Sequence, residues 1–113
     1  MELPAASWKE RILFFFGKRE GFLVSGDSML PTLKDGDVVL INRVAKVAAG
    51  DIILANHPFK KSVKIIKRVK EFTEKGELYL VGDNTGLMES SDSRAFGAVP
   101  LKYLIGKATC RLK

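Results

Sequence analysis

Ser28 is the first candidate for covalent chemistry in this chain of 113 residues. It lies in the stretch Gly26-Asp27-Ser28-Met29-Leu30-Pro31-Thr32-Leu33. A serine hydroxyl is a weak nucleophile until a neighbouring base accepts its proton. The usual base is histidine, and the chain has only His57, which precedes Pro58 and is therefore expected in an extended loop. Either another residue activates Ser28, or Ser28 is a structural residue of a turn-rich stretch.

A candidate base lies in residues 62–72, which have the pattern of a long β-strand. Alternate side chains of a strand point to opposite faces. One face is apolar except for a single lysine and consists of Val63, Ile65, Lys67 and Val69. The other face is basic except for Ile66. A lysine buried among aliphatic side chains has a lowered pKa and can accept a proton. The alternatives are that Lys67 extends to solvent from an edge strand, or pairs with a carboxylate.

A short helix is expected over residues 7–17. Ser7 and Glu10 have the spacing of a capping box, and Gly17 offers a stop. One face would carry the large apolar side chains Trp8, Ile12, Phe15 and Phe16. This face suits either an interfacial contact with a membrane or packing on the domain itself. Packing is favoured, because large apolar residues are scarce in so short a chain.

The rest of the chain has the pattern of β structure. Apolar stretches alternate with turn signals such as Asp35-Gly36 and Lys75-Gly76. The expected strands are residues 21–24, 37–43, 52–55, 62–72, 77–81 and 103–112, and a loop rich in Gly, Asn, Ser and Asp covers 82–97. The predicted fold is mainly β, a small coiled sheet or β-barrel with a short N-terminal helix.

Composition and charge narrow the classes of function. The hydrophobic content of 46% and net charge of +6 fit an ordinary folded domain. The basic residues are spread along the chain, so no nucleic-acid partner is predicted. No stretch approaches the roughly 20 apolar residues of a membrane span, and none has the features of an export signal. A single cysteine, Cys110, excludes an internal disulfide, and the lone His57 has no Cys/His cluster around it, so no metal or other cofactor is expected.

Three motifs, in order, resemble those of the signal peptidase I family of serine proteases. The first is the stretch 26–33, similar to the family's Ser-Met-x-Pro-Thr-Leu. The second is Ile66-Lys67-Arg68-Val69, similar to Lys-Arg-Val. The third is Gly82-Asp83-Asn84 with Ser90-Ser91-Asp92-Ser93-Arg94-Ala95-Phe96-Gly97, similar to Gly-Asp-Asn … Ser-x-Asp-Ser-Arg-x-x-Gly. The resemblance runs from about Val24 to the C-terminus.

The resemblance implies a serine endopeptidase with a serine–lysine dyad. Ser28 would be the nucleophile and Lys67 the general base. The backbone amide of Ser28 would be one oxyanion donor. Some members supply a second donor from a hydroxyl two residues before the nucleophile, where this chain has Gly26. Residues 1–20 would then be a helical segment and residues 21–113 the catalytic core of the signal peptidase I type.

The third motif implies supporting roles. Ser90 would hydrogen-bond and orient the lysine, while Asp92 and Arg94 would form an ion pair that braces the site. The remaining residues, Gly82, Asp83 and Asn84, would form the turn that places this loop near the dyad.

The chain also departs from typical members, which carry N-terminal membrane spans and a larger insertion after Lys-Arg-Val. Its shortness, and Asn56-His57-Pro58-Phe59 before the strand that contains Lys67, resemble the nickel-type superoxide dismutase maturation proteases. Such a protease removes the N-terminal extension of the dismutase precursor. The resemblance therefore implies that this precursor is the protein partner and that the location is cytoplasmic. Peripheral contact of the helix with a membrane remains an alternative.

Three other functions remain as alternatives. One is a general type I signal peptidase that acts on secretory preproteins at the membrane. Another is a self-cleaving regulator resembling the SOS repressor proteases, disfavoured because too few residues precede Ser28 for a DNA-binding domain. The last is a non-catalytic β binding module, disfavoured by the complete dyad. The sequence predicts neither the scissile bond nor the oligomeric state.

Overall fold

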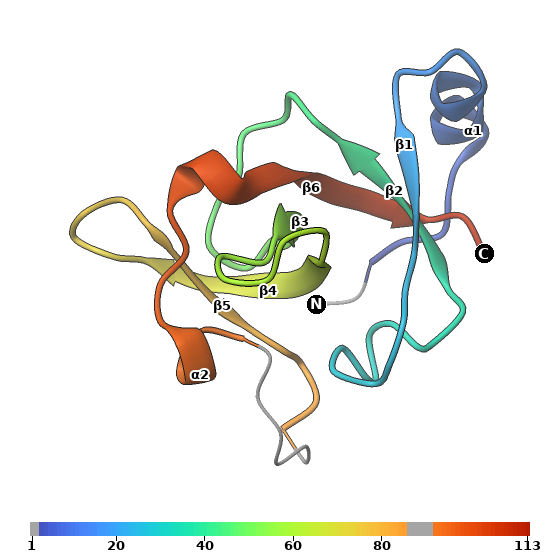
Figure 1. Ribbon diagram of the computed structural model, residues 1–113. Coiled ribbons are helices and arrows are strands. Elements are labelled where there is room, and N and C mark those ends of the chain that lie inside the picture. The colour runs from blue at the N-terminus through green and yellow to red at the C-terminus, as the bar shows by residue number, and fades with distance from the viewer. Residues whose placement is uncertain (1–2, 86–91) are drawn as a thin grey trace.

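The chain folds into one six-stranded antiparallel sheet, seen in a computed structural model that describes residues 3–85 and 92–113 (Figure 1). The strand order across the sheet is β1-β2-β6-β3-β4-β5. The strands are β1 (Glu20–Leu23), β2 (Val38–Asn42), β3 (Ile52–Asn56), β4 (Lys64–Phe72), β5 (Leu78–Val81) and β6 (Leu104–Arg111). The predicted mainly β, coiled-sheet fold with a short N-terminal helix is confirmed.

The sheet curls because its ladders are interrupted. Register shifts fall within the pairings β2–β6, β3–β6 and β4–β5. A β-bulge bends its strand and increases the local twist. The curl brings the loop that follows β1 and the loop that follows β5 to the same side of the molecule (Figure 1). A backbone hydrogen bond of 2.9 Å from Asn84 N–H to the Ser28 carbonyl joins these two loops.

Separate apolar clusters cover the two faces of the sheet. In β3, Ile52 and Leu54 are buried in one cluster, and Ile53 and Ala55 in the other. The strand is therefore a continuous apolar run instead of an alternating one, as expected for a strand buried on both faces.

β4 lies between β3 and β5, so it is not an edge strand. Ile65 and Val69 are buried in the second cluster, and Lys67 on the same face is only 4% exposed. This structure excludes the alternative in which Lys67 reaches solvent from a sheet edge. Ile66, on the opposite face, is buried too, because that face carries the first cluster.

The helix α1 (Trp8–Phe15) begins where the sequence predicts, because Ser7 Oγ accepts a hydrogen bond from Glu10 N–H at 3.3 Å. The expectation that its apolar face packs on the domain is wrong. Trp8, Phe15 and Phe16 are 75%, 83% and 70% exposed. The opposite side of the helix faces the sheet, because Glu10 is bound there to side chains of the domain.

A second helix, α2 (Ser93–Phe96), and a 3-10 turn, η1 (Leu101–Tyr103), were not predicted. Asp92 caps α2 by accepting Arg94 N–H at 3.0 Å, and Gly97 ends it with a φ of 85°. A helix of four residues is too short to show apolar periodicity, so the sequence offered only these end signals. Within the two described ranges, no helix has the length and apolar character needed to cross a membrane.

Candidate active site

Ser28 lies in the loop between β1 and β2, and the residues around it fix that loop. Met29, immediately after it, is 1% exposed and is buried in the first apolar cluster with Leu33. Gly26 N–H donates to Asp35 Oδ1 at 2.8 Å. The buried Met29 and Leu33 fix the loop after Ser28, and the Gly26–Asp35 hydrogen bond fixes it before Ser28. Ser28 itself is half-buried and lines a cleft.

The Ser28 hydroxyl contacts the lysine on the apolar face of β4. Lys67 Nζ and Ser28 Oγ are 2.6 Å apart and hydrogen-bonded. The two residues are separated by 39 positions in the chain, so only the curled sheet brings them together. A hydroxyl in direct contact with an amine has the geometry required for proton transfer between them.

Burial lowers the pKa of Lys67 below its ordinary value of 10.5. The nearby Asp92 carboxylate opposes this shift and the Arg94 guanidinium adds to it. A buried ammonium loses its hydration, which disfavours the charged form. The site therefore favours the neutral form of this amine more than water does.

The turn Gly82–Asn84 packs directly on the peptide of Ser28. Asn84 N–H donates to the Ser28 carbonyl at 2.9 Å, and its side-chain Nδ2 donates to the Asp27 carbonyl at 3.0 Å. A Cβ atom at Gly82 would lie 2.6 Å from the same Ser28 carbonyl oxygen. This position therefore has no room for any side chain.

Asp83 connects all three motifs. Its carboxylate accepts hydrogen bonds from Arg68 Nε at 2.8 Å and Nη2 at 2.7 Å. It also accepts the Thr32 hydroxyl at 2.6 Å. Burial by itself would raise the pKa of Asp83, but the bonds from Arg68 and Thr32 outweigh it and lower that pKa. The sequence predicts only a turn at Asp83 and no separate role for Arg68, because no local pattern reveals a contact across 51 residues.

Asp92 binds the end of β5 to α2. Its Oδ2 accepts Gly82 N–H at 2.9 Å and lies 2.7 Å from Arg94 Nη2. Burial by itself would raise the pKa of Asp92, but the bonds from Arg94 and the backbone amides lower it. Ser93, which the sequence analysis did not single out, accepts Leu80 N–H at 2.9 Å. Ser90, the residue expected to orient the lysine, lies outside the described residues.

The dyad lines a cleft of about 480 Å³. Its walls include Phe22, Val63 and Ile65, as well as His57. His57 Nδ1 accepts the backbone N–H groups of Phe59 and Lys60, each at 3.0 Å. Burial lowers the pKa of His57. Nδ1 of His57 thus stabilises the loop after β3 by accepting these two hydrogen bonds. The side chain that hydrogen-bonds Ser28 Oγ is Lys67.

The described part of the chain contains no group of three or more His, Cys, Asp or Glu side chains that could hold a metal ion.

A serine held against a buried lysine, here on a curled antiparallel sheet, is an arrangement that one group of serine-type peptidases uses. Comparison with known proteins gives the family. The profile of the family described as Peptidase S24-like matches residues 18–95, so the chain belongs to that family.

Relatives support a signal-peptidase-like protease. A Xenopus tropicalis protein named mitochondrial inner membrane protease subunit 1 is 34% identical over 116 positions, which cover 82% of this chain and 68% of that protein. An Arabidopsis thaliana protein named mitochondrial ATP-independent inner membrane protease subunit 1a is 34% identical over 115 positions, covering 79% and 67%. The human mitochondrial inner membrane protease subunit 1 is 28% identical over 108 positions, covering 75% and 64%.

These relatives correct two expectations. They are proteases of a membrane, which contradicts the cytoplasmic location predicted from the sequence. They also support the signal-peptidase-like family without supporting its nickel superoxide dismutase branch. The branch assignment depended on chain length and a short stretch around His57, and neither feature determines which precursor is cleaved or where.

Proposed function

We propose that this chain is a processing peptidase of the signal peptidase I type, which cleaves precursor proteins at a membrane by means of a Ser28–Lys67 dyad. The observation that carries the proposal is the 2.6 Å contact between Ser28 Oγ and the amine of a lysine that is 4% exposed. The names of the relatives support a membrane as the place of action.

In the proposed reaction, neutral Lys67 accepts the Ser28 proton while Oγ attacks the scissile carbonyl. The resulting ammonium then gives this proton to the leaving amine, which releases the first product and leaves an ester on Ser28. Lys67, neutral again, activates a water molecule that hydrolyses the ester and restores the serine. The backbone N–H of Ser28 is the proposed donor to the oxyanion formed in both steps.

The surrounding residues are positioning residues in this proposal. Gly82 and Asn84 fix the Ser28 peptide, and Asp83 holds the loop of Ser28, β4 and the turn in one arrangement. Asp92 and Arg94 brace the turn from α2. Ser90 is proposed, from the motif it occupies, to orient the lysine amine.

The test is cleavage of a purified secretory preprotein, with the new N-terminus determined by sequencing. Ser28→Ala and Lys67→Met should each lower the cleavage rate at least about 1000-fold, because each removes one partner of the proton transfer. Lys70→Met is the matched control, since Lys70 is an exposed lysine on the same strand. Full cleavage by Ser28→Ala would contradict the proposal.

The precursor of nickel superoxide dismutase serves as a competing substrate in the same assay. The proposal predicts a higher kcat/KM for the secretory preprotein. Exclusive cleavage of the dismutase precursor would refute the proposal that the chain acts on secretory preproteins in general. It would support a protease specific for the dismutase precursor.

A further inference from the structure

The helix α1 has two chemically different faces. Successive residues of an α-helix are about 100° apart around its axis. Glu10, Leu13 and Phe14 therefore lie on one side, which faces the sheet. Glu10 bonds to the domain there, and the Phe14 ring lies beside Gly21 while 39% of Phe14 stays exposed. The other side forms what we call the docking face, composed of Trp8, Lys9, Arg11, Ile12, Phe15 and Phe16.

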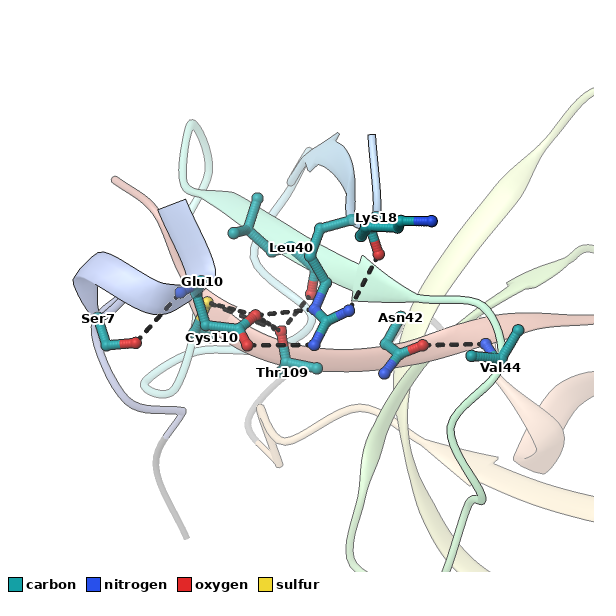
Figure 2. Close-up of polar contacts among 9 residues, drawn as sticks. Ser7, Glu10, Lys18, Leu40, Asn42, Val44, Thr109 and Cys110 are labelled. Carbon is teal, nitrogen blue, oxygen red and sulfur yellow. Dashed lines mark hydrogen bonds and ion pairs between the residues drawn. The ribbon is translucent and has the colours of Figure 1, made fainter. Parts of the chain in front are cut away.

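The inward side is held by a network around Glu10 (Figure 2). Arg19 donates to both carboxylate oxygens, Nε at 2.9 Å and Nη2 at 3.2 Å. The Thr109 hydroxyl on β6 donates to the same carboxylate at 2.8 Å. The bond from Arg19 lowers the pKa of Glu10. The only acidic residue of α1 is thus turned toward the domain and neutralised there.

The docking face is consequently apolar and cationic. Its four apolar side chains span an arc of about 100° on the helix surface, with Arg11 beyond one edge and Lys9 beyond the other. Trp8, Phe15 and Phe16 are at least 70% exposed, and Ile12 is 45% exposed. The adjoining groove of about 520 Å³, between the end of α1 and the loop after β2, adds the exposed Lys18 and Val44.

We propose that the docking face binds the surface of an anionic lipid bilayer, with its aromatic rings in the interface and its basic side chains at the head groups. Aromatic residues flanked by lysine and arginine are the composition of helices that lie in the membrane interface. A second copy of the chain fits less well, because a twofold contact through this face would bring its own cations together. The inference deepens the proposed function and rests on it for the choice of a membrane as partner.

The docking face lies away from the cleft. In Figure 1, α1 lies at one end of β1, and the loop that carries Ser28 follows the other end. A bilayer bound to α1 therefore leaves the dyad open to its substrate. Changes in the docking face can for the same reason be made without touching Ser28 or Lys67.

The first experiment uses Trp8, the only tryptophan of the chain, as the probe. Vesicles of phosphatidylcholine with about a third phosphatidylglycerol should shift its emission to the blue and carry the protein upward in flotation. Pure phosphatidylcholine vesicles should bind much more weakly, and added salt should weaken binding to the anionic vesicles, because salt screens the attraction. Failure to bind anionic vesicles, or equal binding to neutral ones, would overturn the proposal.

Two variants separate the apolar and the cationic parts. Phe15→Ser/Phe16→Ser should weaken binding to anionic vesicles about 100-fold, because the bilayer would no longer bury the two aromatic rings. Lys9→Gln/Arg11→Gln should weaken it about 25-fold, at about fivefold for each basic residue near the anionic surface. The matched controls are Phe59→Ser/Leu101→Ser, which are exposed apolar residues elsewhere, and Lys70→Gln/Lys75→Gln on the β4–β5 hairpin.

The controls should bind vesicles as the wild type does, and all variants should keep its thermal midpoint, because the replaced side chains are exposed. Variants of the docking face that bind like the wild type would refute the proposal. So would a stable dimer in light scattering that Phe15→Ser/Phe16→Ser dissociates, since a second copy would then cover this face. Vesicle binding does not depend on cleavage. If the protein binds anionic vesicles but cleaves no precursor, the proposed function is refuted and the proposed membrane contact of the docking face still stands.

Discussion

At the scale of single residues, Lys67 owes its chemistry to the environment of its amine. Burial lowers its pKa from the ordinary 10.5, and the charges of Asp92 and Arg94 act on it in opposite directions. In the proposed mechanism, only the neutral amine accepts the Ser28 proton. The proposal therefore implies that the proportion of competent enzyme rises with pH until Lys67 is fully deprotonated.

We expect the rate of peptide cleavage to rise with pH along a limb whose midpoint lies below 10.5. Asp92→Asn should move this midpoint to lower pH, because the Asp92 carboxylate stabilises the charged lysine. The measurement is the pH profile of kcat/KM for the wild type and this variant. A midpoint that moves to higher pH in Asp92→Asn would contradict the assignment of Lys67 as the base.

At the scale of elements, the loop after β5 and the loop after β1 act as one unit. Gly82 touches the Ser28 carbonyl so closely that even a methyl group must displace it. The backbone bond from Asn84 and the Asp83 bonds to Thr32 and Arg68 hold the same two loops together. The position of Ser28 thus depends on a turn more than fifty residues away.

Gly82→Ala should lower kcat about 100-fold while the protein remains folded, because a shift of about 1 Å in a reacting group has an effect of this size. The control is Gly21→Ala, whose new Cβ would make ordinary contacts with side chains, the Phe14 ring at 3.4 Å and Val38 Cγ1 at 3.8 Å. Steady-state kinetics and circular dichroism of both variants provide the check. Wild-type kcat in Gly82→Ala would show that Ser28 does not depend on this contact.

At the scale of the whole molecule, stability in acid depends on the carboxylates that join the motifs. The pKa values of Asp83 and Asp92 are lowered in the folded state from the ordinary 3.8. Well above pH 3.8, from about pH 5 upward, their contribution to the free energy of unfolding is complete. As the pH falls toward that value and below it, the unfolded chain binds protons first, so this contribution is lost progressively.

We expect Asp83→Asn to lower the free energy of unfolding at pH 7 by about 2 kcal/mol or more, because the partly buried Arg68 loses its carboxylate partner. Between pH 5 and pH 2 the variant should show a shallower loss of stability than the wild type. Urea unfolding at several pH values measures both effects. Glu74→Gln, at the exposed β4–β5 turn, controls for the loss of one negative charge. If the free energies of unfolding of Asp83→Asn and the wild type fall in parallel as the pH is lowered, the prediction is wrong.

Some features of the site follow from local patterns in the sequence. The alternation around Lys67 indicates one lysine on an apolar face, because strand geometry fixes which side chains share a face. Ser28 is marked by a motif, and Ser7 marks the start of α1, because caps act over three or four residues. The strands are predictable for the same reason: apolar patterns and turn residues are local properties of the chain.

Other features were decided by the tertiary structure. The separation of Ser28 Oγ and Lys67 Nζ, the bonds that join Asp83 to Thr32 and Arg68, and the outward face of α1 all depend on contacts between distant segments. Glu10 shows the difference most clearly. The sequence marks it as part of a helix cap, whereas the fold places Arg19 and Thr109 beside it and so determines which face of α1 points to solvent. Sequence patterns determine local geometry, but the curl of the sheet determines which local pieces meet.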